Sequence, residues 1–152
     1  MNAFRVVSVV SLGLLAGSLL LEGLVLVPHW RSLGSSAFAE LHAGFAPRLY
    51  RYFAPLTAGA VLISVSAALA VAWTTEPNAT DWFTVAAGAF AASLLAFYRL
   101  YFHSANARLP LLARSGDALG LSSELHRWQR THQVRTAVSL VAFVLAELGV
   151  AG

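Results

Sequence analysis

The fold is decided by stretches such as TAVSLVAFVLAELGV, which runs from Thr136 to Val150 near the end of the chain. Glu147 is the one charged residue in this apolar run. Together with the residues before it, the run predicts a membrane span at about residues 123–150, roughly 42 Å long at 1.5 Å per residue. Because the hydrocarbon core of a bilayer is only about 30 Å thick, the first turns of this helix must reach the headgroup layer.

The composition of the whole chain agrees with a membrane protein. Of the 152 residues, 58% are hydrophobic and only 11% are charged, and the mean hydropathy is +0.68. A soluble domain carries about 25% charged residues, so this chain cannot cover a water-facing surface with polar groups. We therefore expect one integral membrane domain over residues 1–152, with four spans at about residues 4–28, 54–74, 82–103 and 123–150.

Four spans of this kind predict an all-α fold, an up-down four-helix bundle. The first connection, residues 29–53, has apolar side chains and His42 at helical spacing, which predicts an interfacial or re-entrant segment after the first span. The third connection, residues 106–121, is richer in turn residues. The middle turn, residues 75–81, contains a proline, and the candidate N-caps of the helix after it are Thr80 and Asp81.

The charge distribution predicts the orientation in the membrane. All ten basic residues are arginines, and nine of them lie in or beside the first and third connections. Only Arg5 lies on the other side, where the middle turn carries Glu76 and Asp81. By the positive-inside rule, both arginine-rich connections are cytoplasmic and both termini are outside. We expect a multi-pass protein of a bacterial inner membrane, with its polar site at the cytoplasmic face.

The sequence also excludes several partners and chemistries. The isoelectric point of about 10.0 does not indicate nucleic-acid binding, because no soluble domain presents a basic stripe. The chain has no cysteine, which excludes disulfides, thiolate metal sites and thiol redox chemistry. The expected partners are the lipid bilayer and a hydrophobic small molecule. The small residues Gly13 and Gly17 would let another helix approach closely, including one from a second copy in a homo-oligomer.

Two helical faces bring polar side chains to the same membrane interface. Trp128, His132 and Arg135 stand at i, i+4 and i+7 at the start of the fourth span, so they share one face. The same spacing recurs at the end of the third span in Arg99, His103 and Asn106. Because both faces lie at the same depth, we expect them to line one pocket.

Glu22 is the candidate acid of this pocket. It precedes Pro28 by six residues, which places it roughly 9 Å from the interface along the first span. A carboxylate inside a membrane is costly to expose to lipid, so we expect it to face the interior of the bundle at a functional site. His42 in the first connection can approach the same pocket. Tyr98 belongs either to an interfacial aromatic belt or to the pocket wall.

Two short motifs give the chain a family resemblance. They are Asn-x-x-Leu after the third span and Trp-x-x-x-His-x-x-Arg at the start of the fourth, at Asn106, Leu109, Trp128, His132 and Arg135. In these motifs the chain resembles the anthrone-oxygenase-like family of small four-span membrane proteins, many of which have no assigned function. The resemblance covers roughly the C-terminal third, and it extends to the first half only in layout, with His42 as the counterpart of a histidine after the first span. It implies oxidation of aromatic polyketide anthrones to quinones with dioxygen.

An anthrone-like or quinol-like substrate suits a pocket at the edge of a membrane. Such a molecule is flat and apolar, and it would enter between helices from the bilayer. We interpret His132 as a base that removes a proton, assisted by Asn106 and Glu22, and Arg135 as the group that stabilises the resulting anion. The electron-rich anion can then reduce dioxygen without a metal or another cofactor. The remaining candidates for substrate contact are Trp128, His103, Tyr98, Arg99 and His42.

Two alternatives stay open. In the first, iron, copper or zinc is bound by His42, His103 and His132 together with Glu22, because imidazole and carboxylate groups suit all three metals. No closely spaced pair of histidines in the sequence supports this set. In the second, the chain is not an enzyme but a small-molecule carrier, a channel subunit or a component of a larger membrane complex.

Overall fold

The computed structural model describes residues 3–73 and 78–151, and every regular element in that part of the chain is helical. Two of these elements, η1 and η2, are π-helical turns that join their neighbours without a break, so the chain forms four long helices. The elements are α1 (Ala3–Leu21), η1 (Glu22–Leu26), α2 (Val27–Ser32), α3 (Ser35–Ala72), α4 (Ala79–Phe97), η2 (Tyr98–Phe102), α5 (His103–Ser115) and α6 (Ala118–Ala151).

Each of the four long helices is long and apolar enough to cross a membrane. They contain 30, 38, 37 and 34 residues, which corresponds to roughly 45–57 Å at 1.5 Å per residue. Since a hydrocarbon core is only about 30 Å thick, each helix extends beyond it. By length and composition these four helices are those of a multi-pass membrane protein.

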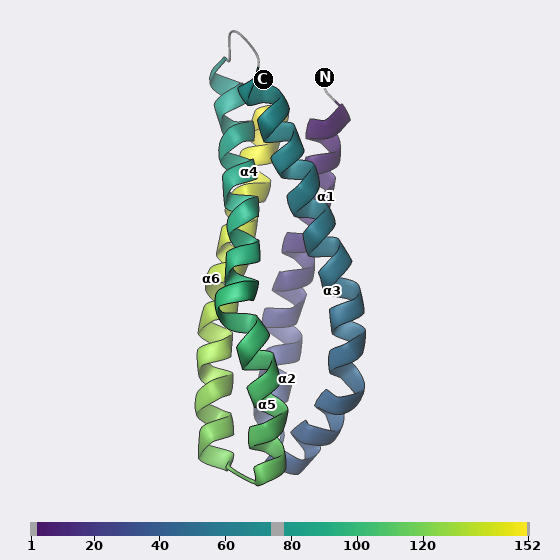
Figure 1. The fold of residues 1–152 in the computed structure, drawn as a ribbon, viewed down its shortest axis with the longest axis vertical. Helices are drawn as coiled ribbons and strands as arrows, with labels where there is room; N and C mark the ends of the chain where they lie inside the picture. The colour runs from purple at the N-terminus through teal and green to yellow at the C-terminus, as the bar shows by residue number, and fades with distance from the viewer. Residues whose placement is uncertain (1–2, 74–77, 152) are drawn as a thin grey trace.

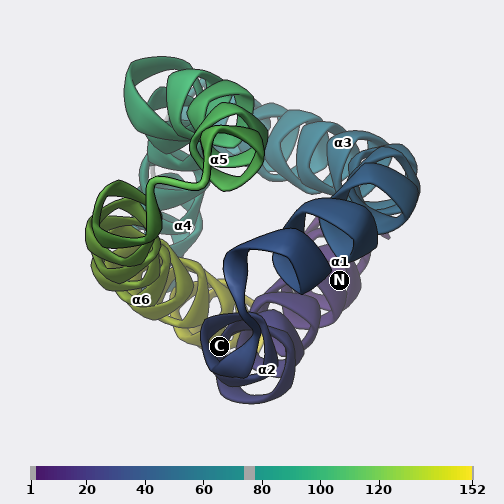
Figure 2. The ribbon, with the colours of Figure 1, turned by 90° about the horizontal axis from the view of Figure 1, so that it is seen from below.

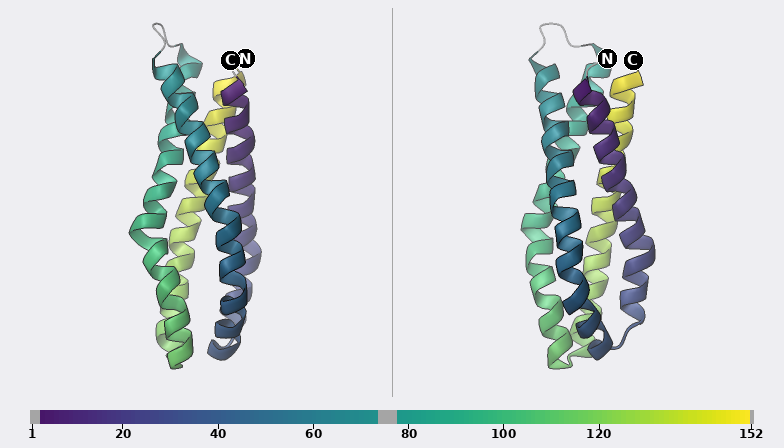
Figure 3. Two further views of the ribbon diagram at one scale, coloured as in Figure 1. Left: turned by 45° about the vertical axis from the view of Figure 1, so that its right-hand side comes forward. Right: turned by 90° about the vertical axis from the view of Figure 1, so that its right-hand side faces the viewer.

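The helices run alternately up and down the bundle (Figure 1). Both termini lie at one end, and the short connections at residues 33–34 and 116–117 lie at the other. Viewed along the bundle, α1 lies beside α3 and α6, while α4 and α5 lie across from it (Figure 2). Two side views show the long, narrow shape that results (Figure 3). The prediction of an all-α, up-down four-helix bundle is confirmed.

The helices are longer than the predicted spans because most of the connecting residues are helical as well. The first helix continues past residue 28 to Ser32. Residues 35–53 form the first half of α3 and are continuous with the second span, rather than a separate interfacial segment. Pro47 and Pro55 lie inside α3, as spanning helices tolerate prolines where nearby groups satisfy the freed carbonyls.

The third connection is also almost entirely helical. α5 continues through Pro110 to Ser115, and the turn is confined to Gly116 and Asp117. Gly116 has a φ of 73°, a left-handed conformation that ends the helix and that glycine adopts without a steric penalty. The Asp117 carboxylate accepts a hydrogen bond from the Gly120 backbone N–H at 2.8 Å. α6 therefore begins before the predicted start near residue 123.

A capping box starts α4. Asn78 Oδ1 accepts hydrogen bonds from the backbone N–H groups of Thr80 and Asp81 at 2.9 Å and 3.0 Å, and the Asp81 carboxylate accepts one from the Asn78 N–H at 2.8 Å. The N-cap is therefore Asn78 instead of Thr80 or Asp81, because its side chain reaches the two free donors that follow it. The rest of the predicted middle turn lies outside the described residues, including Glu76 and Pro77.

Two hydrophobic clusters fill the bundle along its length. The cluster nearer the termini is aliphatic, with Leu12 and Leu19 among its members. The cluster nearer the two short connections is rich in aromatic residues, with Trp30 and Trp128 among its members. Between them along the first helix lies Glu22, a buried carboxylate. The polar site lies at this level, where Glu22 interrupts the apolar core.

Candidate functional site

The site lies beside two π-helical turns in different helices. η1 starts at Glu22 and η2 starts at Tyr98, and both of these side chains line the same cavity. A π-helical turn bonds residue i to residue i+5 and inserts an extra residue into a helix, and such turns occur frequently at functional sites. Here η1 and η2 change the phase of their helices at the level of the site, where Glu22 and Tyr98 face the cavity.

Glu22, Arg135 and His132 form a buried polar cluster at this level. Arg135 Nη2 donates one hydrogen bond to Glu22 Oε2 at 3.1 Å and another to His132 Nδ1 at 2.9 Å. Glu22 Oε2 also lies 3.6 Å from His132 Nδ1. The side chains of Glu22 and Arg135 are only 6% and 16% exposed. As predicted, Glu22 faces the interior of the bundle and lies within reach of a histidine.

His132 is held in a defined tautomer by its two hydrogen bonds. Its Nε2 lies 2.9 Å from the backbone oxygen of Leu19, and its Nδ1 faces Arg135. Because a carbonyl oxygen only accepts and a guanidinium only donates, Nε2 carries the hydrogen and Nδ1 accepts. His132 is 1% exposed and is not among the residues that line the cavity. Both ring nitrogens are therefore already engaged inside the protein.

Trp128 and Gly23 fix the position of the His132 ring from two directions. The indole of Trp128 stacks on the imidazole, with ring centroids 4.9 Å apart and an angle of 11° between the planes. A Cβ atom at Gly23 would lie 3.1 Å from both Cδ2 and Nε2 of the imidazole. Glycine at this position thus permits the close approach of α6 to η1. The i, i+4, i+7 face predicted for Trp128, His132 and Arg135 is present as a set of direct contacts.

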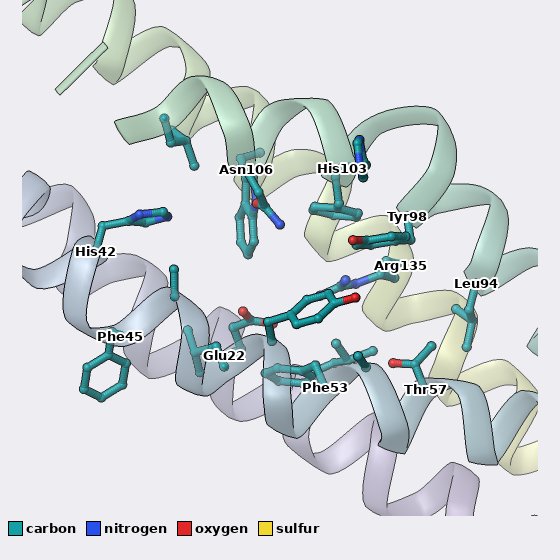
Figure 4. Close-up of a pocket in the computed structure, with 18 of the residues that line it drawn as sticks. Glu22, His42, Phe45, Phe53, Thr57, Leu94, Tyr98, His103, Asn106 and Arg135 are labelled. Carbon is teal, nitrogen blue, oxygen red and sulfur yellow. The ribbon is translucent and has the colours of Figure 1, made fainter. Parts of the chain in front are cut away.

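Asn106 links the third helix to this arrangement. Its Oδ1 accepts a hydrogen bond from Trp128 Nε1 at 2.9 Å. Since an indole N–H can only donate, this bond fixes the amide so that its NH₂ group points toward the cavity (Figure 4). Phe102, on the same helix, lies beneath the Arg135 guanidinium, 4.3 Å from the ring centroid. Of the two polar faces predicted from the sequence, Asn106 of the third helix and Trp128 of the fourth are therefore in direct contact.

A cavity of about 430 Å³ opens in front of this cluster. Its volume is within the range of about 300–1,000 Å³ that is typical of small-molecule sites. Asn106 and His103 line it from α5, Glu22 faces them from the first helix, and Arg135 and His42 lie toward its two sides (Figure 4). Most of the remaining lining is apolar or aromatic, including Trp30, Phe38, Leu49, Phe53, Leu94 and Leu109.

Seven of the predicted site residues line the cavity directly, and two do not. The seven are Glu22, His42, Tyr98, His103, Asn106, Trp128 and Arg135. The two others are His132, which lies behind the wall, and Arg99, which is exposed and lies outside the lining.

The prediction that Arg99 shares a face with His103 is wrong because Arg99 lies inside η2, which changes the phase of the helix. In a π-helical turn the residue five positions on takes the place that the fourth occupies in an α-helix. Tyr98 and His103 accordingly face each other across this turn, with ring centroids 6.0 Å apart. Arg99 is rotated away from the cavity toward the surface of the bundle.

The alternative metal site is not assembled in the structure. Among residues 3–73 and 78–151, no group of three His, Cys, Asp or Glu side chains is close enough to hold a metal ion. Of the four proposed ligands, Glu22 and His132 lie 3.6 Å apart, but both ring nitrogens of His132 are hydrogen-bonded and neither is free for a metal. His42 and His103 line the cavity at other positions.

Sequence reasoning missed the large contribution of α3 to the site. The lining residues of this helix recur at intervals of three and four, which is the signal of one helical face. The same pattern also predicts an interfacial segment, which is the expectation that the structure corrects. The α3 residues that line the cavity are Phe38, Leu41, His42, Phe45, Ala46, Leu49, Tyr50, Phe53, Ala54, Thr57 and Ala58.

Comparison of the chain with family models, curated proteins and solved structures finds no match. The resemblance to the anthrone-oxygenase-like family therefore depends on the two short motifs alone. The site itself combines a buried carboxylate, a buried guanidinium and an amide donor at the wall of an aromatic cavity. It can accept a proton at Glu22 and stabilise an anion at Arg135.

Proposed function

We propose that the protein is a membrane-embedded oxidoreductase that oxidises a flat, apolar hydroxyaromatic compound, anthrone-like or quinol-like, with dioxygen. The observation that carries this proposal is the buried pair of Glu22 and Arg135 on the wall of an otherwise apolar cavity. A charged pair is costly to bury, and at intramembrane positions such groups mark functional sites. An aromatic substrate would fill the apolar part of the cavity and present its acidic group to the pair.

In this proposal Glu22, not His132, is the base. Glu22 lines the cavity, whereas both nitrogens of His132 are hydrogen-bonded behind the wall. Glu22 removes a proton from the substrate, and Arg135 and the Asn106 amide stabilise the resulting anion. His132 acts as a positioning residue, because it fixes the Arg135 guanidinium at 2.9 Å.

The electrons balance without a resident cofactor. With an anthrone, the methylene carbon becomes a carbonyl, one atom of dioxygen becomes the new carbonyl oxygen, and the other leaves in a water molecule. With a quinol, two electrons and two protons pass to dioxygen, which gives the quinone and hydrogen peroxide. In both reactions dioxygen is the oxidant. The reductant is the electron-rich substrate anion that forms when Glu22 removes the proton.

The family resemblance supports the same proposal. The five residues of the two motifs lie around one cavity, since Asn106, Leu109, Trp128 and Arg135 line it and His132 supports the wall. Residues that are 22 positions apart, Asn106 and Trp128, are hydrogen-bonded to each other. Motifs that belong to one site would require this proximity.

The orientation is part of the proposal. We propose that the arginine-rich ends of the helices, where residues 33–34 and 116–117 connect them, lie in the cytoplasm of a bacterial cell and that both termini lie outside. A reporter fused after Gly152 that is active only in the periplasm tests this orientation. Activity of a cytoplasm-specific reporter at the same position would show that the orientation is the opposite.

A second candidate is a carrier that binds the same compound without oxidising it. The observation in its favour is that the Glu22 carboxylate is already paired with Arg135, so the site can bind a polar group without any transfer of protons. This candidate and the enzyme use the same cavity. They differ in whether dioxygen is consumed.

Oxygen uptake by purified protein with an anthrone or a quinol tests the enzyme. Glu22→Gln keeps a hydrogen-bonding side chain next to Arg135 but removes the base, so we expect the rate to fall about 100-fold or more. Glu147→Gln, on the exposed surface of α6 near the termini, is the matched control and should keep the full rate. Substrate binding with no oxygen uptake in the wild type would favour the carrier.

A further inference from the structure

The cavity extends along much of the length of the bundle. Its lining residues on α3 extend from Phe38 to Ala58, about 30 Å along the axis of that helix at 1.5 Å per residue. The volume over this length is only about 430 Å³. A cavity of this length, called the slot below, can hold an extended chain in addition to a ring system.

The charged groups of the slot lie at the level of Glu22, and the end nearer the termini is mostly apolar. On the first helix, the lining residues on the side of Glu22 toward the termini are Leu15 and Leu19, both buried. At that end the other helices contribute a single hydroxyl group, Thr57, among apolar neighbours. That end of the slot therefore suits an apolar chain. The residues there from α3 and α4 are Ala54, Thr57, Ala58, Leu94 and Leu95.

The slot opens sideways, between α3 and the stretch formed by α4, η2 and α5. Lining residues from the first helix and α6 are buried or nearly so, from Leu15 at 1% to the Arg135 side chain at 16%. The exposed lining residues all belong to the two other helices. They are Phe45, Tyr50 and Ala58 on α3, Leu95 on α4, and His103 and Asn106 on α5.

The polar part of the slot specifies a head group that both donates and accepts hydrogen bonds. Glu22 offers an acceptor, while Arg135 and the Asn106 amide offer donors. A fatty acid carboxylate would be repelled by Glu22, whereas a phenolic hydroxyl can donate to Glu22 and accept from Arg135. Aromatic side chains around this region, among them Phe102 and Tyr98, suit a ring.

The geometry points to a membrane-dissolved hydroxyaromatic compound with an extended apolar chain as the substrate, entering sideways between α3 and the α4–η2–α5 stretch. This inference rests on the proposed function and specifies its substrate class. The ring lies between Glu22 and Asn106. The chain extends past Ala54 and Leu94 and leaves the slot through its lipid-facing opening.

A photoreactive probe tests the inference independently of turnover. The probe is a hydroquinone whose long alkyl chain ends in a diazirine, added to the full-length protein in lipid nanodiscs and irradiated. Peptide mapping should place the label on α3 near residues 54–58 and on α4 near residues 94–95, and excess unlabelled alkyl hydroquinone should suppress it. Ala54→Phe fills the slot and should remove most of this label. Ala70→Phe, at an exposed alanine of the same helix outside the slot, should keep it.

Two results would overturn the inference. One is label spread over the outer faces of the helices and insensitive to competitor, a measurement on the wild type that does not depend on any variant folding. The other is undiminished label at residues 54–58 in Ala54→Phe. The proposed oxidation is judged separately by oxygen uptake. Label in the slot without oxygen uptake would support the inferred ligand class and contradict the oxidase activity. Oxygen uptake with label elsewhere would support the oxidase activity and contradict the inferred ligand class.

Discussion

The Glu22 carboxylate and the Arg135 guanidinium lie 3.1 Å apart, although 113 residues separate them in the chain. They join the first helix to the last at the level where the apolar core is interrupted. Because both side chains are largely buried, each one neutralises a charge that would otherwise be left in a medium of low polarity. The pair therefore connects the stability of the bundle with the chemistry of the cavity.

The first prediction concerns that connection. Arg135→Leu leaves the Glu22 carboxylate buried without its partner, so we expect it to lower the free energy of unfolding by about 3–5 kcal/mol, and Glu22→Leu to act similarly. The double variant removes both charges and should cost clearly less than the sum of the single changes. Unfolding in mixed micelles measures all four proteins. Additive effects would show that the two side chains are not coupled.

The second prediction separates a positioning role for His132 from a role as base. His132→Ala removes a fully buried ring, so we expect a loss of about 3 kcal/mol in stability together with a lower rate. His132→Gln can still donate to the Leu19 carbonyl and accept from Arg135, and it should recover much of the rate. The rate should depend on pH in the same way in wild type and His132→Gln. A base at His132 would instead leave both variants equally inactive.

The third prediction uses two glycines of the same helix. A Cβ at Gly23 meets the His132 ring at 3.1 Å, so Gly23→Ala should displace the imidazole, cost about 1–3 kcal/mol and lower the rate. Gly17→Ala meets nothing within 4 Å and should leave both stability and rate at or above the wild-type level. Unfolding and oxygen uptake of the two variants check this. Equal effects would mean that the close contact at Gly23 is unimportant.

Much of the site could be predicted because helical spacing determines which side chains share a face. Trp128, His132 and Arg135 meet as their spacing indicates, and the cost of an intramembrane carboxylate correctly placed Glu22 inside the bundle. The same rule failed for Arg99. The π-helical turn η2 shifts the phase of its helix, and no residue type in the sequence announces such a turn.

The burial of His132 and the use of α3 were beyond sequence reasoning for another reason. Periodicity shows which residues share a face, but not how deep a side chain lies or which neighbour occupies its hydrogen bonds. His132 is sequestered by the Leu19 carbonyl and by the close approach of Gly23, two backbone features of a distant helix. The apolar pattern of the lining face of α3 is also that of an interfacial segment, so spacing alone does not distinguish the two.

The last prediction concerns the amide of Asn106. Its Oδ1 accepts from the Trp128 indole at 2.9 Å, which leaves the NH₂ group as a donor to the cavity. Asn106→Asp keeps an acceptor for the indole but loses that donor and adds a negative charge near the proposed anion. We expect it to fold with nearly normal stability while binding of the hydroquinone probe weakens about tenfold, the cost of roughly one charge-assisted hydrogen bond.

Asn106→Leu is the informative comparison. It loses the donor and also leaves the buried Trp128 N–H without a partner, so it should cost about 1–3 kcal/mol in stability in addition to weaker binding. Titration of tryptophan fluorescence with the probe measures affinity in both variants, since Trp30 and Trp128 line the cavity. If Asn106→Asp bound the probe as tightly as the wild type, the amide would serve only to orient Trp128. In that case Arg135 would donate to the substrate and Asn106 would not.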